Sequence, residues 1–127
     1  MLFRSATPEE LSEVAPRLLG MIDPQRIVRT RIARPAPEVI AAFLAITDLA
    51  SAVSDALDEL GVGGAIPASE LRPVIDGGKA VGPAITLRYE PVGGSVGARY
   101  QRGERALLAD RDLYGVGQAG DIGVFHS

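Results

Sequence analysis

An ordered strand, helix, strand pattern in the second half of the chain constrains the fold more than any other feature. Residues 81–89 and residues 122–125 are short apolar stretches bounded by glycine and proline, which is typical of strands. Between them, residues 104–114 have the spacing of a short amphipathic helix that ends at Gly115. Parallel strands need a long connection of this kind. We therefore predict an α/β fold in which a layered sheet is flanked by helices.

The first predicted helix has a clear start signal. Thr7 is the expected N-cap, Pro8 is the first helical residue, and Glu10 is placed to close a capping box. The apolar stripe that follows predicts a helix that continues as far as Gly20. Residues 26–35 then mix arginines with β-branched residues at no regular period, which predicts an extended linker or a short strand with a basic outer face.

Two more helices are predicted before the strands begin. Residues 37–46 carry apolar residues on one side, and a third helix is expected to start after Thr47 or Asp48. Its apolar residues recur every three or four positions until Gly61 ends it.

Composition limits the class of protein. A chain of 127 residues with 46% apolar residues can bury one core, so we expect one domain, with an N-terminal helix and basic linker over residues 1–35 and the main α/β part over residues 36–127. No cysteine is available for a disulfide or a thiolate metal site. The net charge of −3 gives no general attraction to nucleic acid or anionic lipid, so we expect neither DNA nor a membrane as a partner. Without a secretion signal or a long apolar run, a cytoplasmic protein is expected.

Four segments, in order along the chain, carry a resemblance to a known family. They are Thr47-Asp48-Leu49, Ser54-Asp55-Ala56-Leu57-Asp58-Glu59-Leu60-Gly61, Gly78-Lys79-Ala80-Val81-Gly82-Pro83-Ala84-Ile85-Thr86 and Gly120-Asp121-Ile122-Gly123-Val124-Phe125. Over residues 38–125 the chain resembles the RraA-like family. That family includes 4-hydroxy-4-methyl-2-oxoglutarate aldolases, the protein regulator of ribonuclease E, and proteins labelled dimethylmenaquinone methyltransferase.

The resemblance implies a divalent-metal-dependent lyase that cleaves a carbon–carbon bond next to a 2-oxo acid and releases pyruvate. It also implies Mg²⁺ or Mn²⁺ as the cofactor and a trimer or hexamer as the assembly. In aldolase members the main metal ligands follow the last matched strand, in a Gly-rich loop and an Arg-Asp motif, and neither is found in this chain. We therefore expect this chain to be the N-terminal part of an RraA-like domain, without the main metal ligands.

Three alternatives remain open for the function. The chain is part of such a lyase, or it is a non-catalytic regulatory or binding module on the same scaffold, or it is one subunit of a split enzyme that a complementary second chain completes. The apolar strand at residues 122–125 favours a partner chain, because such strands normally lie inside a sheet.

Asp55 and Asp58 are the candidate cleft residues. They lie one helical turn apart, as paired carboxylates in a metal or acid/base site do. The Ser-Asp-Ala-Leu-Asp pattern also recurs in the RraA-like family, which supports a place near its cleft. The alternative is a solvated helix face.

His126 is the only histidine and follows an apolar strand. Open α/β sheets bind ligands at the carboxyl ends of their strands, so His126 is a candidate for substrate binding. The RraA-like family usually has an aspartate at this position, and this chain departs from it. A solvated histidine is the alternative.

Arg102 and Arg105 are the other candidates for substrate binding. They lie in and just after the Gly-rich stretch of residues 93–103, which we predict to be a loop. Guanidinium groups hold carboxylates through two hydrogen bonds, so this loop is suited to a small acidic substrate such as an oxo-dicarboxylate. In the alternative interpretation, the arginines lie on the surface and pair with three nearby acidic residues, Glu104, Asp110 and Asp112.

Overall fold

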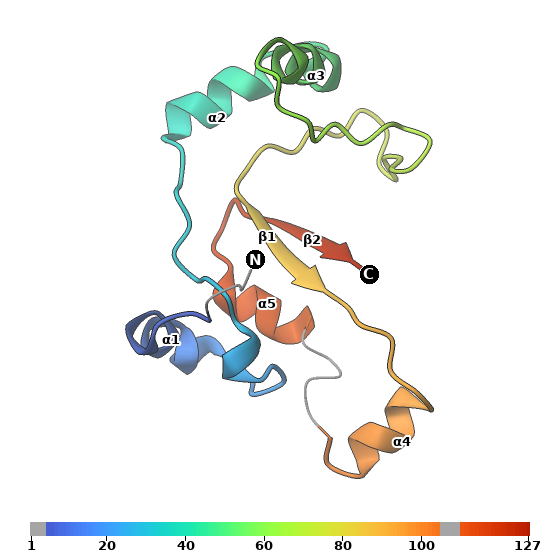
Figure 1. Cartoon of the computed structure of the whole chain (residues 1–127). Coiled ribbons are helices and arrows are strands. Elements are labelled where there is room, and N and C mark those ends of the chain that lie inside the picture. Colours follow the sequence, from blue (N-terminus) through green and yellow to red (C-terminus); the bar gives the residue numbers. More distant parts are fainter. Residues whose placement is uncertain (1–4, 105–109) are drawn as a thin grey trace. The chain divides into compact units, whose positions relative to one another are not determined.

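Residues 5–104 and 110–127 are described in the computed structural model of this chain (Figure 1). Their contacts divide them into two units. Unit 1 comprises Met1–Arg34 and Pro83–Ser127, as far as these are described, and unit 2 comprises Pro35–Gly82. One limit of unit 2 thus falls where the sequence predicts the end of the basic linker.

The predicted strand, helix, strand order forms the centre of unit 1. Strands β1 (Ala84–Arg88) and β2 (Ile122–His126) pair in parallel, in register from the first residue of each to the last. The connection between them carries helices α4 (Val96–Gln101) and α5 (Asp110–Val116). The described residues therefore form a mixed α/β structure with a two-stranded parallel sheet. This confirms the predicted α/β class.

Helix α4 corrects the prediction of a loop over residues 93–103. Ser95 is its N-cap, and the Ser95 hydroxyl accepts a hydrogen bond from the backbone N–H of Ala98 at 3.3 Å. The glycines around this cap hide the helix in the sequence, because glycine weakens any helical pattern. The predicted helix at 104–114 is displaced toward the C-terminus, and its residues 105–109 lie outside those described.

Helix α1 (Pro8–Val14) begins as predicted and ends early. The Thr7 N–H donates to the Glu10 carboxylate at 2.8 Å, and the Glu10 N–H donates to the Thr7 hydroxyl at 3.2 Å. The hydrogen bond from the Thr7 backbone is the main cause of a lowered pKa of Glu10, and the Thr7 hydroxyl acts in the same direction. The helix does not reach Gly20, because Pro16 has no N–H and does not fit a helix interior. The chain continues as the 3₁₀ turn Ala15–Arg17.

The basic segment after α1 is an extended linker. It follows a second 3₁₀ turn, Pro24–Arg26, and forms no strand over residues 27–34. Three of the four arginines of residues 26–35 make ion pairs within unit 1, namely Arg26 with Glu90 at 3.0 Å, Arg31 with Glu9 at 2.8 Å and with Glu13, and Arg34 with Asp121.

The core of unit 1 lies between α5 and the sheet. Leu87 of β1 and Leu113 of α5 are buried against each other, with Ile22 and Ile85 packed beside them. Other buried apolar side chains come from the N-terminal segment, namely Ala6, Val14, Met21 and Ile27. The N-terminal segment thus completes the layer on this side of the sheet.

Asp112 is buried in this core, with only 1% of the residue exposed. Its carboxylate accepts three backbone hydrogen bonds, from Leu19 at 2.5 Å, Met21 at 2.6 Å and Ile22 at 2.7 Å. The alternative interpretation that Asp112 pairs with surface arginines is therefore wrong. Asp112 instead holds the loop after α1 against α5.

Unit 2 contains helices α2 (Pro37–Leu44) and α3 (Leu49–Glu59), close to their predicted bounds. Asp48 is the N-cap residue of α3. Gly61, with a φ of 66°, ends it, and the Val62 N–H donates to the Leu57 carbonyl at 2.8 Å, as in a common glycine C-cap.

Among the described residues, no single helix is long and apolar enough to cross a membrane. Helices α2 and α3 reach that length and composition only together, as a pair bent by 111°.

Candidate functional site

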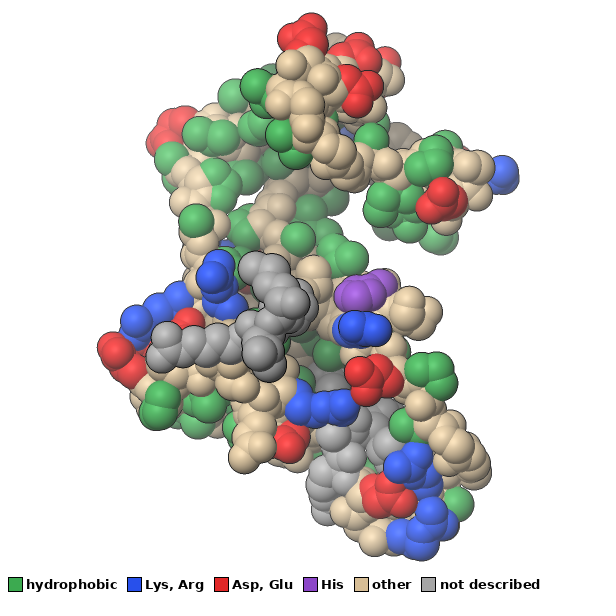
Figure 2. Space-filling view, viewed as in Figure 1, with side chains coloured by type: hydrophobic (Ala, Val, Ile, Leu, Met, Phe, Trp, Pro, Cys, Tyr) green, Lys and Arg blue, Asp and Glu red, His purple; other side chains and the backbone are tan. Residues whose placement is uncertain are grey.

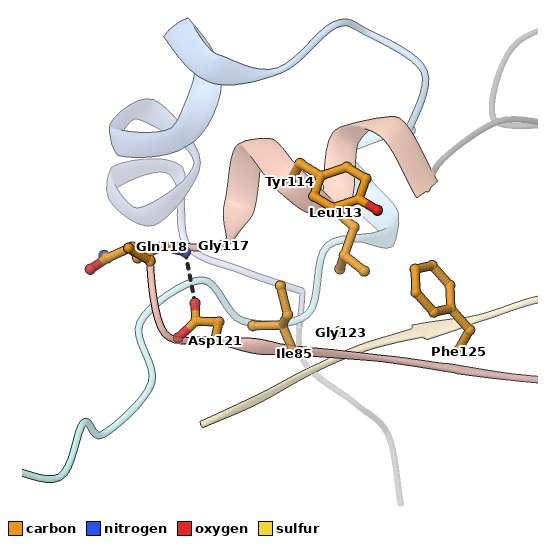
Figure 3. A pocket seen from close by; sticks show the side chains of 9 residues that line it. Ile85, Leu113, Tyr114, Gly117, Gln118, Asp121, Gly123 and Phe125 are labelled. Atoms are coloured by element: carbon orange, nitrogen blue, oxygen red, sulfur yellow. Dashed lines mark hydrogen bonds between the residues drawn. The ribbon is translucent and has the colours of Figure 1, made fainter. Parts of the chain in front are cut away.

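A cavity of about 430 Å³ lies between α5 and the sheet in unit 1 (Figure 3). Side chains of α5 form one wall and side chains of β1 and β2 form the other, and a turn closes one end. The lining residues are Leu113 and Tyr114 from α5, Ile85, Gly123 and Phe125 from the strands, and Gly117, Gln118, Ala119 and Asp121 from the turn that follows α5. Figure 3 shows Leu113 and Ile85 pointing toward each other across this space.

Two glycines, Gly117 and Gly123, line the cavity. A Cβ at Gly117 would lie 2.7 Å from Cδ1 of Ile85, and a Cβ at Gly123 would lie 3.5 Å from the ring of Phe125. A larger residue at Gly117 would therefore push the end of the Ile85 side chain aside, whereas the contact at Gly123 is an ordinary one.

Asp121 is the charged group at the closed end. Its carboxylate accepts hydrogen bonds from both terminal nitrogens of Arg34, one of them at 2.8 Å, and from the Gln118 N–H at 2.8 Å. The Asp121 side chain is only 2% exposed and that of Arg34 is 31% exposed. The Arg34 hydrogen bonds are the main cause of a lowered pKa of Asp121, and the same pair raises the pKa of Arg34.

This ion pair predicts a loss of stability in acid. A carboxyl group whose pKa is lower in the folded state stabilises the fold above its ordinary pKa, about 3.9, and loses that contribution as pH falls through the folded value. The melting temperatures of Asp121→Asn and of the unchanged protein should therefore differ most at neutral pH and become equal in acid. Asp76→Asn, which alters an exposed carboxylate, is the control. A difference independent of pH would contradict this role for the charge of Asp121.

The carboxyl ends of the two strands bring together Arg88 and His126. These are Cα partners in the parallel register, so both lie on the same face of the sheet. Both are exposed, and Figure 2 shows the purple histidine beside a blue side chain. The Tyr89 N–H donates to the His126 carbonyl at 2.7 Å, which holds this end of the sheet together. His126 therefore stands where the sequence predicts it, at the end of a parallel strand.

Arg102 lies at the end of α4, on the surface. Its terminal nitrogen is 3.4 Å from the Glu104 carboxylate, and Nε of Arg99 donates to the same carboxylate at 2.6 Å. The alternative interpretation, in which Arg102 lies on the surface and pairs with Glu104, is thus confirmed, and Arg99 pairs with Glu104 as well. Arg102 remains 65% exposed and retains donors for a ligand. Arg105 lies outside the described residues.

The structure does not join the predicted substrate-binding residues into one group. Within the described residues, no hydrogen bond or ion pair connects Arg102 with His126. Asp55 and Asp58 lie exposed on α3, in unit 2. The described residues contain no group of three or more His, Cys, Asp or Glu side chains that could hold a metal ion. The role of Asp55 and Asp58 as cleft residues stays a prediction.

Sequence reasoning missed Arg88, Arg34 and Asp121. A signal existed for Arg88, because it ends the first predicted strand as His126 ends the second, and a parallel register pairs such ends. No sequence signal joins Arg34 to Asp121, since 87 positions separate them.

Comparison with protein-family models, with curated proteins and with solved structures found no match for this chain. Its function is therefore argued from its own residues and from the sequence resemblance described above.

Proposed function

We propose that this chain binds the carboxylate of a small 2-oxo acid at the carboxyl ends of β1 and β2. The pairing of Arg88 with His126 carries this proposal. An arginine offers a permanent positive charge with paired N–H donors, and a histidine offers at least one more N–H. Together, they provide the donors that a carboxylate needs, at the edge where parallel sheets bind ligands.

The activity that we propose for the complete protein is divalent-metal-dependent cleavage of a carbon–carbon bond next to a 2-oxo acid. The resemblance to the RraA-like family supports this reaction class, and with it an RraA-like fold, a trimer or hexamer and a cytoplasmic location. The described residues alone do not fit Mg²⁺ or Mn²⁺. Because the main metal motif of the family is not found in this sequence, we assign the main metal ligands to a complementary second chain, and assign to Arg88 and His126 only the binding and orientation of the substrate.

Binding of pyruvate, measured by titration calorimetry, tests the proposal. A charge-assisted hydrogen bond contributes roughly 1.5–3 kcal/mol, so Arg88→Ala should weaken binding by about 10- to 150-fold. His126→Ala should weaken it too. Arg72→Ala removes the same charge from an exposed position in unit 2 and should leave the affinity unchanged. Equal affinities in Arg88→Ala and Arg72→Ala would refute the site.

Turnover is a separate arm of the same experiment. We expect no pyruvate release from a 4-hydroxy-2-oxo acid by the 127-residue chain alone, with or without Mg²⁺ or Mn²⁺. Metal-dependent turnover by this chain would mean that it supplies metal ligands after all.

A non-catalytic binding or regulatory module is the second candidate. The observation that favours it is the large exposed apolar surface of unit 2, which a partner protein could cover. Pyruvate binding at Arg88 without turnover in the completed assembly would favour this candidate over the lyase.

A further inference from the structure

Unit 2 has no buried side chain among its described residues. Many of its large apolar side chains are exposed, from 37% for Ile46 to 100% for Val74, and the exposed ones of α2 are Val39, Phe43 and Leu44. The apolar stripe of α3, Leu49, Val53 and Leu57, is half-buried. A segment of this length that fully buries no side chain has little apolar burial to offset the entropy lost on folding. Helices α2 and α3 therefore need a cover to be stable.

The charge of unit 2 indicates what kind of cover fits. Residues 35–82 contain seven acidic and two basic residues, a net charge of −5, and residues 35–71 contain no basic residue at all. In α3 the apolar residues recur every three or four positions, and Asp55 and Glu59, four positions apart, flank that stripe. Figure 2 shows red and green side chains over both helices.

We propose that α2 and α3 form a docking surface for a basic amphipathic helix of a partner protein. The apolar side of such a helix would cover the exposed apolar side chains, and its lysines or arginines would meet the acidic flank of α3. Apolar anchors supply affinity in this mode of recognition, and charge complementarity supplies orientation and selectivity.

The structure favours a different polypeptide over a second copy of this chain. The arginine-rich segment of unit 1 is the obvious basic partner, yet three of its four arginines, Arg26, Arg31 and Arg34, are already in ion pairs with acidic residues of their own unit. An anionic membrane is disfavoured as well, because the acidic flank would face lipid headgroups of the same sign.

Two synthetic helices of about 18 residues, roughly five turns, test the proposal with the full chain. Both carry leucine at three- and four-residue spacing, and the remaining positions are lysine in one and glutamate in the other. Fluorescence anisotropy should detect micromolar binding of the lysine helix, weakening with added salt, and no binding of the glutamate helix.

Two matched triple variants locate the surface. The variant Asp55→Asn, Asp58→Asn, Glu59→Gln should bind the lysine helix at least about 10-fold more weakly. The variant Glu9→Gln, Glu13→Gln, Glu90→Gln changes the net charge equally in unit 1 and should bind within about 2-fold of the unchanged chain. The ion pairs that this second variant removes are exposed and contribute little to stability, so the variant should fold. Circular dichroism checks the folding of both variants.

Three results would overturn the proposal. The first is equal binding of the two synthetic helices, and the second is an equal loss of affinity in the two triple variants. The third is self-association, measured by sedimentation, that the α3 variant abolishes, since that would make a second copy the occupant. This test does not depend on pyruvate binding, so it can fail or succeed independently of the function proposed above.

Discussion

Replacing Asp112 with alanine is expected to lower the free energy of unfolding of unit 1 by about 3–5 kcal/mol. The carboxylate is buried and accepts the N–H groups of Leu19, Met21 and Ile22. Removing it leaves these donors without an acceptor, and each buried donor without a partner costs about 1–3 kcal/mol. A domain is typically stable by only about 5–15 kcal/mol, so this one change should remove much of the stability.

Urea unfolding followed by circular dichroism measures this effect. Asp112→Asn keeps the shape and one acceptor oxygen, so it should lie between alanine and the unchanged protein. The control is Asp76→Asn, an exposed position where a change of about 0.5 kcal/mol or less is expected. If Asp112→Ala cost no more than Asp76→Asn, the three hydrogen bonds would not hold the N-terminal loop in place.

Alanine at two helical glycines is expected to change stability in opposite directions. At Gly115 in α5, a Cβ would lie 2.5 Å from the backbone oxygen of Arg17 and 3.1 Å from its carbonyl carbon. Backbone atoms cannot rotate away as a side chain can, so Gly115→Ala should cost about 3 kcal/mol, at the upper end of typical overpacking effects. The gain in helix propensity, about 0.5–1 kcal/mol, is too small to offset this.

Gly97 in α4 is the matched control. The nearest atom to a Cβ there is the Ser95 hydroxyl oxygen at 3.8 Å, an ordinary contact. Gly97→Ala should therefore raise the free energy of unfolding by about 0.5–1 kcal/mol through helix propensity alone. Thermal unfolding of both variants shows whether each substitution stabilises or destabilises the protein. Stabilisation by Gly115→Ala would mean that α5 does not approach Arg17 closely.

Local signals predicted the element starts better than the element lengths. Thr7 and Glu10 fixed the start of α1, because a capping box needs only residues that are close in sequence. The end of α1 was predicted too late, since the apolar stripe outweighed a proline in its middle. Helix α4 was missed, because its one strong signal, the Ser95 cap, lies among glycines.

The candidate sites depended more on long-range pairing. Arg88 and His126 meet only because two strands, joined through α4 and α5, pair in one particular register. A shift of a single residue would put these side chains on opposite faces. Sequence alone placed His126 at the end of a strand, but it gave no means to pair His126 with Arg88.

The sequence by itself determined the α/β class, the capping of α1, the approximate bounds of α2 and α3, and the acidic charge of residues 35–82. These follow from periodicity, caps and composition, which act over a few residues. Only the tertiary structure decided that Asp112 is buried and Asp55 exposed, since both are aspartates in helical patterns of similar polarity. Burial depends on which distant segment packs against a helix. For Asp112 that segment is residues 19–22, about ninety residues earlier in the sequence.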